Sequence, residues 1–263
     1  MRISSTRNPV VRYVRGLERA SARRADGVYI AEGVRLLTEA IDTGQEATIA
    51  LYDPAALERS AAGSFLLSRL PAWAERSYEV DPQVLSAAAQ TEHPAGALAV
   101  LRFPFEPPLT AQSDARLGVV LDAVADPGNA GTIVRTAAAA GVGYVVALAG
   151  SADLFAPKVV RAGMGAHFRL PLYCGVTWDE VRAELRDVPA VALEADGGVS
   201  IYAFRWPDRA LLVVGSEAHG LSPEVRAGVK NFIHIPMRAG VESLNASVAA
   251  AIVIYSHLGP SIP

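Results

Sequence analysis

The sequence predicts an α/β protein with a large carboxyl-terminal domain, built on a mostly parallel sheet, and a smaller α/β domain before it. From Leu117 to the end of the chain, short aliphatic runs alternate with helical segments, which is typical of a parallel sheet with helices on both faces. A more compact alternation occupies the start of the chain. The segment PFEPPLTAQSDAR separates the two, and its prolines stiffen a linker and oppose sheet pairing. We therefore expect domains at 1–103 and 117–263, joined by a linker at 104–116.

The amino-terminal domain is expected to contain at least four strands and three helices. The predicted strands are Val28–Ala31, Thr48–Tyr52, a short strand near Tyr78, and Ala97–Arg102. The predicted helices are Val34–Thr43, which Gly44 ends, Ala55–Arg69 and Pro82–Gln90.

The carboxyl-terminal domain is expected to hold at least six strands. They are Leu117–Asp122, residues 142–149, Arg169–Tyr173, Ala190–Glu194, Leu211–Val214 and Phe232–Met237. The predicted helices are one that Asn129 caps and that ends near Gly141, then Trp178–Asp187 and Ala246–Tyr255.

Three strand-to-helix junctions of this domain carry polar residues in the same place. Their sequences are ADPGNAGTIVR, GSEAHG and RAGVESLN. In a parallel sheet, the loops at the carboxyl ends of the strands gather at one edge, where such folds bind ligands. The alternative for each loop alone is an ordinary helix cap, with Ser243 or Asn245 bonding the first turn. Because three junctions share the pattern, we expect one site.

Composition indicates a globular chain with a local basic patch. Of its 263 residues, 51% are hydrophobic, and the formal net charge is −3. Against one acid, Glu18, the first 24 residues contain seven arginines: Arg2, Arg7, Arg12, Arg15, Arg19, Arg23 and Arg24. Such a patch is either a nucleic-acid contact or a solvated helix face.

Several classes of protein are disfavoured. The single cysteine, Cys174, excludes an internal disulfide and a multi-cysteine zinc site. The uncharged stretch 136–152 is short for a membrane span and contains three glycines, so we expect no membrane segment. The amino terminus lacks the apolar core of a signal peptide, so we expect a cytoplasmic protein. The first strand is not followed by GxGxxG, which disfavours a nucleotide-dependent oxidoreductase.

The three junctions also carry a family resemblance. The chain resembles the SpoU (TrmH-like) RNA methyltransferases of the SPOUT superfamily in three motifs that occur in the same order. The first is NAGTIVR, with Asn129, Gly131 and Arg135, and the second is GSEAHG, with Gly215, Ser216, Glu217 and Gly220. The third is IPM followed by ESLNASVA. The resemblance implies a deep trefoil knot, S-adenosylmethionine as cofactor without a metal, and a homodimer. It implies methylation of a ribose 2′-hydroxyl, foremost in ribosomal RNA.

The same resemblance implies site residues. The catalytic residues would be Arg135, Asn129, Glu217, Ser243 and Asn245, and the cofactor would contact Val214, Gly215, Ile235, Met237, Leu244 and Asn245. Six residues separate Asn129 from Arg135, which is nearly two turns, so both are expected on one side of a helix. Arg135 would bind phosphate and orient the hydroxyl, because a guanidinium with a pKa above about 12 is a poor base. Glu217 would order the site by pairing with Arg135, whereas Glu242 and His219 are weaker candidates.

The amino-terminal domain resembles the L30e-like RNA-binding domain that precedes the catalytic domain in many SpoU enzymes. The resemblance rests on EGVRLLTEAI and TEHPAGALAV, although Ala95 stands where glutamine is common. Within it we expect RNA contacts from the basic patch, at Arg7, Arg12, Arg15, Arg23 and Arg24. The alternatives to a ribosomal RNA methyltransferase are a transfer RNA 2′-O-methyltransferase and a non-catalytic RNA-binding or ribosome-assembly protein on the same scaffold.

Overall fold

The protein was analysed as a computed structural model, which describes residues 1–91, 94–104, 106–240 and 243–259. Its contacts divide the chain into two compact units. The first comprises Met1–Phe105 together with Phe155–Phe168, and the second comprises Glu106–Leu154 and Arg169–Pro263. The division near residue 105 lies at the predicted linker. The return of segment 155–168 to the first unit has no counterpart in the domain boundaries that the sequence suggests.

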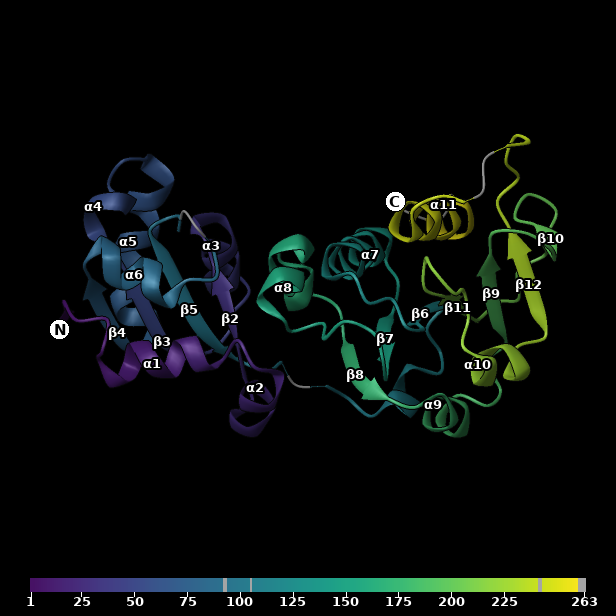
Figure 1. Ribbon diagram of the computed structural model, residues 1–263, viewed down its shortest axis with the longest axis horizontal. Helices are drawn as coiled ribbons and strands as arrows, with labels where there is room; N and C mark the ends of the chain where they lie inside the picture. The colour runs from purple at the N-terminus through teal and green to yellow at the C-terminus, as the bar shows by residue number, and fades with distance from the viewer. Residues whose placement is uncertain (92–93, 105, 241–242, 260–263) are drawn as a thin grey trace. The chain divides into compact units, whose positions relative to one another are not determined.

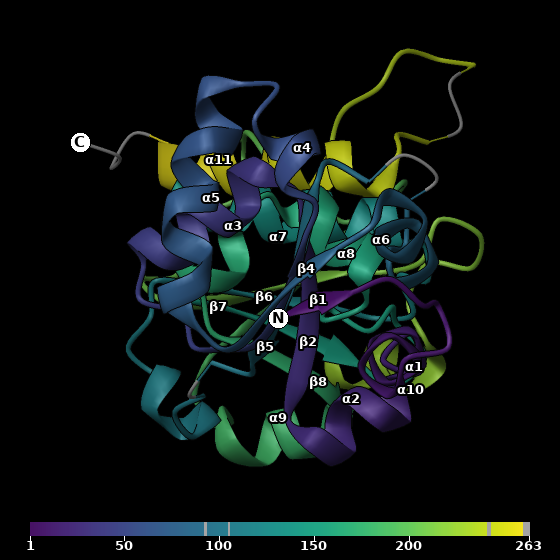
Figure 2. The same cartoon turned by 90° about the vertical axis from the view of Figure 1, so that its left-hand side faces the viewer.

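The first unit is a five-stranded mixed sheet with helices on both faces (Figures 1 and 2). The strand order is β1-β4-β3-β5-β2, with β5 antiparallel to both neighbours. The strands are β1 (Arg2–Ile3), β2 (Val28–Glu32), β3 (Ala47–Tyr52), β4 (Ala74–Val80) and β5 (Ala97–Arg102). The helices are α1 (Pro9–Gly16), α2 (Ala20–Asp26), α3 (Val34–Asp42), α4 (Pro54–Leu57), α5 (Ala61–Trp73), α6 (Pro82–Ala88) and α8 (Pro157–Gly163).

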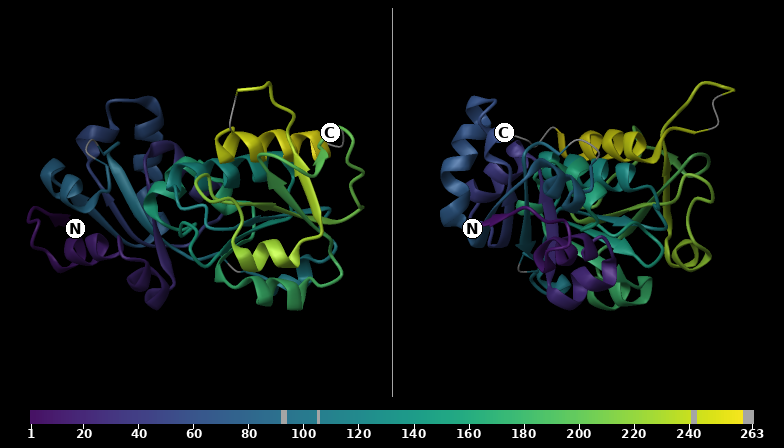
Figure 3. Two further views of the ribbon diagram at one scale, coloured as in Figure 1. Left: turned by 45° about the vertical axis from the view of Figure 1, so that its right-hand side comes forward. Right: turned by 60° about the vertical axis from the view of Figure 1, so that its left-hand side comes forward.

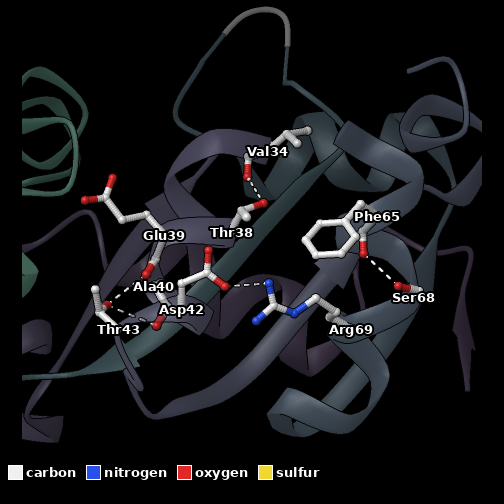
Figure 4. A network of polar contacts seen from close by, with 9 residues as sticks. All are labelled: Val34, Thr38, Glu39, Ala40, Asp42, Thr43, Phe65, Ser68 and Arg69. Atoms are coloured by element: carbon white, nitrogen blue, oxygen red, sulfur yellow. Dashed lines mark hydrogen bonds and ion pairs between the residues drawn. The ribbon is translucent and has the colours of Figure 1, made fainter. Parts of the chain in front are cut away.

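Alternating side chains of this sheet pack against two helical layers. On one face, Val11 and Val14 of α1 and Leu85 of α6 join a buried cluster with Ile30 and Leu51 of the sheet. Helices α3 and α5 pack together on the other side (Figure 2). Figure 4 shows how polar contacts link these two helices, since Arg69 pairs with Asp42 at 2.6 Å. Helices α1 and α6 thus contact each other on one face of the sheet, and α3 and α5 contact each other on the other face.

One predicted helix of the first unit is two helices. The sequence predicts a helix over Ala55–Arg69, whereas α4 ends at Leu57 and α5 begins at Ala61. Ser60 causes the break, because its side chain accepts a hydrogen bond from the Gly63 backbone N–H at 3.0 Å and so caps α5. Helices α1, α2 and α8 are further elements that the sequence analysis did not predict.

The second unit is a seven-stranded sheet in which every pairing is parallel, in the order β10-β12-β9-β11-β6-β7-β8. The strands are β6 (Leu117–Leu121), β7 (Tyr144–Leu148), β8 (Leu172–Val176), β9 (Ala190–Glu194), β10 (Val199–Ser200), β11 (Ala210–Val214) and β12 (Asn231–His234). The helices are α7 (Pro127–Ala140), α9 (Trp178–Glu184), α10 (Pro223–Gly228) and α11 (Ala246–Leu258). This confirms the predicted α/β class and parallel sheet.

Helices cover both faces of the second sheet (Figures 1 and 3). Helices α7 and α11 pack together on one face, and α9 and α10 lie on the other. Trp178 of α9 and Val225 of α10 belong to a buried cluster with Val120 and Val213 of the sheet. The sheet is buried on both faces, as parallel sheets are.

Two strands differ in extent from their predictions because of proline. The sequence predicts strands at Arg169–Tyr173 and Phe232–Met237, whereas β8 begins at Leu172 and β12 ends at His234. Pro171 and Pro236 have no backbone N–H to donate to a neighbouring strand. Ile235 and Met237 consequently lie in the loop beyond β12, at the edge where the sheet can meet a ligand.

Candidate functional site at the carboxyl ends of the parallel strands

The three polar junctions meet at one edge of the sheet, as the sequence predicts. Strands β6, β11 and β9 are consecutive neighbours and β12 follows β9, so the loops after these strands lie next to one another. The chain turns into α7 after β6 and into α10 after β11, and the loop after β12 leads to α11. Neighbouring parallel strands thus bring residues far apart in the sequence to one site.

A chain of three side chains joins the junctions. Asn245 donates from Nδ2 to the Asn129 side-chain oxygen at 3.0 Å, and Asn129 donates from its own Nδ2 to the Glu217 carboxylate. Asn245 is also the N-cap of α11, where its side-chain oxygen accepts from the backbone N–H groups of Ser247 at 3.0 Å and Val248 at 3.3 Å. The three predicted residues Asn129, Glu217 and Asn245 therefore form one polar cluster.

The helix cap sets the direction of these hydrogen bonds. Because the Asn245 oxygen accepts at the cap, its amide nitrogen is the group left to donate to Asn129. Asn129 then presents its own nitrogen to Glu217, which accepts as an ionised carboxylate. Each amide has one orientation that satisfies all its partners, so the cluster positions Glu217 through the amino end of α11.

Replacing Asn129 by aspartate should expose this directionality. Asn129→Asp places a carboxylate against Glu217 and should cost about 1 kcal/mol of stability at neutral pH, since one hydrogen bond becomes a repulsion. Asn129→Ala loses the same hydrogen bond without adding a charge, so only Asn129→Asp should regain stability as the pH falls. Thermal melting of Asn129→Asp and Asn129→Ala between pH 5 and pH 8 tests this, and identical pH profiles for the two variants would contradict the arrangement.

A cavity of about 290 Å³ lies beside the cluster. Its lining comes from the ends of β9 and β11, the loop beyond β12 and the start of α11: Leu193, Glu194, Ala195, Asp196, Val214, Gly215, Ser216, Glu217, Gly220, Ile235, Met237, Ser243, Leu244, Ala246 and Ala249. Five of the six predicted cofactor contacts line it, and the sixth, Asn245, caps the adjoining helix. The predicted catalytic residues Glu217 and Ser243 line it too.

The wall of the cavity beyond β11 is a tight turn. Ser216 and Gly220 exchange two backbone hydrogen bonds of 2.9 Å, and Gly220 adopts φ +66°, a conformation that suits glycine. A Cβ at Gly215 would lie 2.5 Å from the Gly220 carbonyl carbon. The GSEAHG motif needs glycine at both positions because the backbone folds back on itself. His219 is exposed on this turn, and its backbone N–H donates to the Ser216 hydroxyl at 3.1 Å.

The charge of the lining is negative. Glu194, Asp196 and Glu217 contribute three carboxylates, and the described lining contains no lysine, arginine or histidine. Glu194 is paired with Arg226 of α10. A cavity with apolar walls and unneutralised carboxylates suits a ligand with an apolar ring system and positive charge, and it is unsuited to a pyrophosphate.

Arg135 lies outside both the cluster and the cavity. It is exposed on α7 and forms no ion pair or side-chain hydrogen bond with any residue that the structure describes. Six residues turn a helix by about 600°, so the side chains of Asn129 and Arg135 leave α7 roughly 120° apart and do not share one side. Glu217 pairs with Asn129 and not with Arg135. Arg135 is thus a free cation on the surface of the second unit.

Asn129 is also not the cap of its helix. Asp126 caps α7, because its carboxylate accepts from the Asn129 backbone N–H at 2.8 Å. Asn129 stands in the first turn, which frees its side chain for Glu217 and Asn245. The sequence contained the signal for this, since Asp126 is followed by Pro127 and proline favours the first helical position.

Other residues of the site were missed by the sequence analysis. Buried Asp122, directly after β6, accepts from the Ser222 backbone N–H at 2.6 Å and so anchors the start of α10 beside the GSEAHG turn. Leu193 and Glu194 line the cavity from the end of β9 and Asp196 from the residues after it, a segment that carries no recognisable motif. Glu242 lies outside the described residues.

The arginines of the basic patch have different environments. Arg7, Arg12, Arg15 and Arg24 are exposed, as an RNA contact requires. Arg23 is not, because it is 2% exposed and donates from Nη1 to the carbonyl oxygens of Leu17 at 2.8 Å and Glu18 at 2.6 Å. The prediction of an RNA contact at Arg23 therefore conflicts with its position, which is a structural one.

The described residues contain neither a metal-binding cluster nor a membrane-spanning helix. No group of three or more histidine, cysteine, aspartate or glutamate side chains is arranged to hold a metal ion within those residues. Across the same part of the chain, no helix has both the length and the apolar character that crossing a bilayer requires.

The fold and the cavity define the second unit as a parallel α/β domain that binds a ligand at the carboxyl ends of its strands. The chain belongs to the SpoU rRNA Methylase family, whose model matches residues 116–255. The MRM3-like substrate binding domain matches residues 8–99. The family resemblance of the three motifs is thereby confirmed.

Relatives and solved structures agree with this assignment. The chain is 31% identical to the 23S rRNA (guanosine(2553)-2′-O)-methyltransferase RlmP of Bacillus subtilis, over 96% of this chain and 97% of that protein. It is also 31% identical to a Synechocystis protein described as a tRNA/rRNA methyltransferase, over 96% of this chain and 92% of that protein. The crystal structure of the AdoMet-bound rRNA methyltransferase from Sinorhizobium meliloti superimposes with a TM-score of 0.85 at 26% identity, covering 100% of this chain and 99% of that one.

Proposed function

We propose that this protein is an S-adenosylmethionine-dependent methyltransferase that methylates a ribose 2′-hydroxyl of ribosomal RNA. The observation that carries the proposal is the meeting of three SpoU motifs around one cavity, through the cluster of Asn129, Glu217 and Asn245. Membership of the SpoU rRNA Methylase family and the similarity to RlmP over nearly the whole chain support ribosomal RNA as the substrate.

The cavity suits S-adenosylmethionine on chemical grounds. Val214, Ile235 and Leu244 offer apolar surface for an adenine ring, and the carboxylates of the lining favour a cationic ligand. The volume of about 290 Å³ lies near the lower end of the range for small-molecule sites. When bound, S-adenosylmethionine supplies an electrophilic methyl group on a positively charged sulfur.

The residues of the chain then have to position the nucleophile and accept charge. We assign Arg135 to the RNA phosphate next to the target ribose, where its planar guanidinium holds the 2′-hydroxyl in line with the methyl carbon. The hydroxyl proton passes to phosphate or water, because the guanidinium cannot accept it. Ser243 and Asn245 hold the loop at the amino end of α11, and Glu217 orders the GSEAHG turn through Asn129.

Three structural features go with this function. We propose that the backbone of the second unit forms the deep trefoil knot of SPOUT enzymes. The position of the later strand β11 between β6 and β9 supports this topology. Residues 1–103 of the first unit would form an L30e-like RNA-binding domain, before the 104–116 linker and a 117–263 catalytic domain whose segment 155–168 packs in the first unit. A homodimer is supported by exposed apolar residues on α11, Val248 at 49% and Tyr255 at 44%. A cytoplasmic location follows from the proposed substrate.

Cofactor binding is the direct test of this function. S-adenosylmethionine should bind without added metal and raise the melting temperature, because a ligand selective for the folded state stabilises it by mass action. The expected shift corresponds to about 2.7 kcal/mol at a hundredfold excess over the Kd. Calorimetry in the presence of a chelator measures it, with NADH as the control ligand. Absence of binding at millimolar S-adenosylmethionine, or a preference for NADH, would overturn the proposal.

A further inference from the structure

The first unit contains a groove between α1 and the carboxyl end of α6. Its volume is about 730 Å³. One wall, from α1 and the turn after it, carries Arg12, Arg15 and Arg19, and the other wall, from α6 and the residues after it, carries Ser86, Gln90 and Thr91. Helices α1 and α6, which carry the two walls, contact each other. The groove is therefore a built feature of the unit and not a gap between loops.

The arginine wall carries positive charge that no ion pair among the described residues neutralises. Arg12 and Arg15 lie three residues apart on α1 and so on one side of that helix, and Arg19 stands on the turn after it. All three are exposed, and none pairs with a residue in the described ranges. Arg2, Arg69 and Arg102 of the same unit are each paired with a carboxylate. Among the described residues, the lining contains one acid, Glu18, against three arginines.

Buried polar side chains hold both walls in place. Glu32, at the end of β2, is 9% exposed and accepts hydrogen bonds from the Gln90 backbone N–H at 3.2 Å and from the Thr91 hydroxyl. On the opposite side, buried Arg23 bonds the carbonyl oxygens of Leu17 and Glu18, which fixes the turn that carries Arg19. Burying a carboxylate or a guanidinium costs free energy unless the group is hydrogen-bonded. The hydrogen bonds of Glu32 and Arg23 fix the two walls of this groove.

We infer that this groove binds one strand of the RNA substrate by its sugar-phosphate backbone, an inference that rests on the proposed function. The arginines meet the phosphates, and the hydroxyl and amide wall meets the ribose hydroxyls. The described lining has no aromatic side chain on which a base could stack, so the groove recognises backbone and not sequence. Glu32 is a positioning residue that acts through Gln90 and Thr91.

Salt-dependent RNA binding tests the arginine wall. Fluorescent polyuridylate, titrated with the full-length protein, should bind the double variant Arg12→Ala/Arg15→Ala at least about tenfold more weakly than wild type. The slope of log affinity against log salt should fall by about 1.4, since each phosphate contact on a single strand contributes about 0.7. Arg59→Ala is the matched control, because Arg59 is an exposed arginine between α4 and α5 of the same unit.

Thr91 provides the test of the opposite wall. Thr91→Val keeps the shape of the side chain and removes the hydroxyl that Glu32 accepts from, whereas Thr91→Ser keeps the hydroxyl. Thr91→Val should raise the KM for ribosomal RNA severalfold without changing kcat, and Thr91→Ser should restore the wild-type KM. A merely structural role would lower the melting temperature and leave the KM at assay temperature unchanged.

The outcomes separate the groove from the proposed function. Equal RNA affinity of wild type and the double arginine variant would overturn the proposal that this groove binds RNA. A loss of RNA affinity in Arg59→Ala as large as that in the double variant would overturn it too. Competition by polyglutamate as strong as that by polyuridylate of equal charge would also overturn it, in favour of an acidic protein partner. A duplex RNA that binds more tightly than the single strand would contradict the one-strand assignment. Wild-type protein that binds polyuridylate but transfers no methyl group to RNA would overturn the proposed function and leave the groove standing.

Discussion

Arg135→Ala should retain the fold and cofactor binding and lose most of the methyl-transfer rate. Arg135 is exposed on α7 and has no ion-pair partner among the described residues, so its removal disturbs no internal contact. If its guanidinium holds the hydroxyl or balances charge in the transition state, the loss should be about 3 kcal/mol or more, by analogy with the removal of one preorganised donor. That corresponds to a rate reduction of roughly a hundredfold or more.

Single-turnover kinetics with saturating RNA and cofactor isolate this effect from weakened binding. Arg135→Lys should recover little activity, because an ammonium group cannot reproduce a planar, two-pronged contact. Arg186→Ala is the matched control, since Arg186 is an exposed arginine of the same unit that follows α9, on the opposite face of the sheet. Turnover of Arg135→Ala within about threefold of wild type, less than 1 kcal/mol, would show that Arg135 is not catalytic.

Phe155→Ala should destabilise the first unit by about 3–5 kcal/mol, the usual cost of removing a buried phenylalanine. Phe155 is 3% exposed, and its ring centroid lies 4.6 Å from that of Phe103, 5.2 Å from Tyr29 and 5.8 Å from His167. The segment around it also places α8 against β2. Segment 155–168, which follows β6 and β7 of the second unit in the chain, thus completes the core of the first unit.

Denaturant unfolding followed by circular dichroism measures this loss. Phe65→Ala is the control, because Phe65 is a phenylalanine of the same unit that is 56% exposed and has the Arg69 guanidinium near its ring (Figure 4). Its loss should cost under about 1 kcal/mol. Equal effects of the two substitutions would contradict the division of the chain. By the same reasoning, a truncation at the 104–116 linker would deprive segment 155–168 of its packing partners Tyr29 and Phe103.

The local features of the site could be predicted from the sequence because each belongs to one strand-to-helix junction. Proline, glycine and aliphatic runs identify where strands end, and the rules for parallel sheets then place the loops together. This reasoning placed the three loops at one edge of the sheet, the family resemblance pointed to Gly215, Ile235 and Leu244 within them, and all three line the cavity. The alternative interpretation of this loop offered Ser243 or Asn245 as the helix cap, and Asn245 is that cap.

The remaining features depend on contacts between distant residues, which no local pattern encodes. The pairing of Glu217 with Asn129 crosses 88 positions, and the sequence suggested Arg135 as the partner because both belong to motifs. Arg23 looks like its exposed neighbours, and only the turn between α1 and α2 buries it. The contribution of β9 to the cavity depends on strand order, and the placement of α8 depends on tertiary packing that overrides position in the chain.

Mapping ribose methylation tests the central claim most directly. Unmodified ribosomal RNA and transfer RNA are incubated with the purified protein and S-adenosylmethionine, and each phosphodiester bond is then tested for resistance to alkaline cleavage, since a 2′-O-methyl group removes the hydroxyl that attacks the bond. The account predicts resistance at a discrete nucleotide of ribosomal RNA with wild-type protein and its loss with Arg135→Ala. Methylation of a base, modification of transfer RNA alone, or no transfer to any RNA would contradict it.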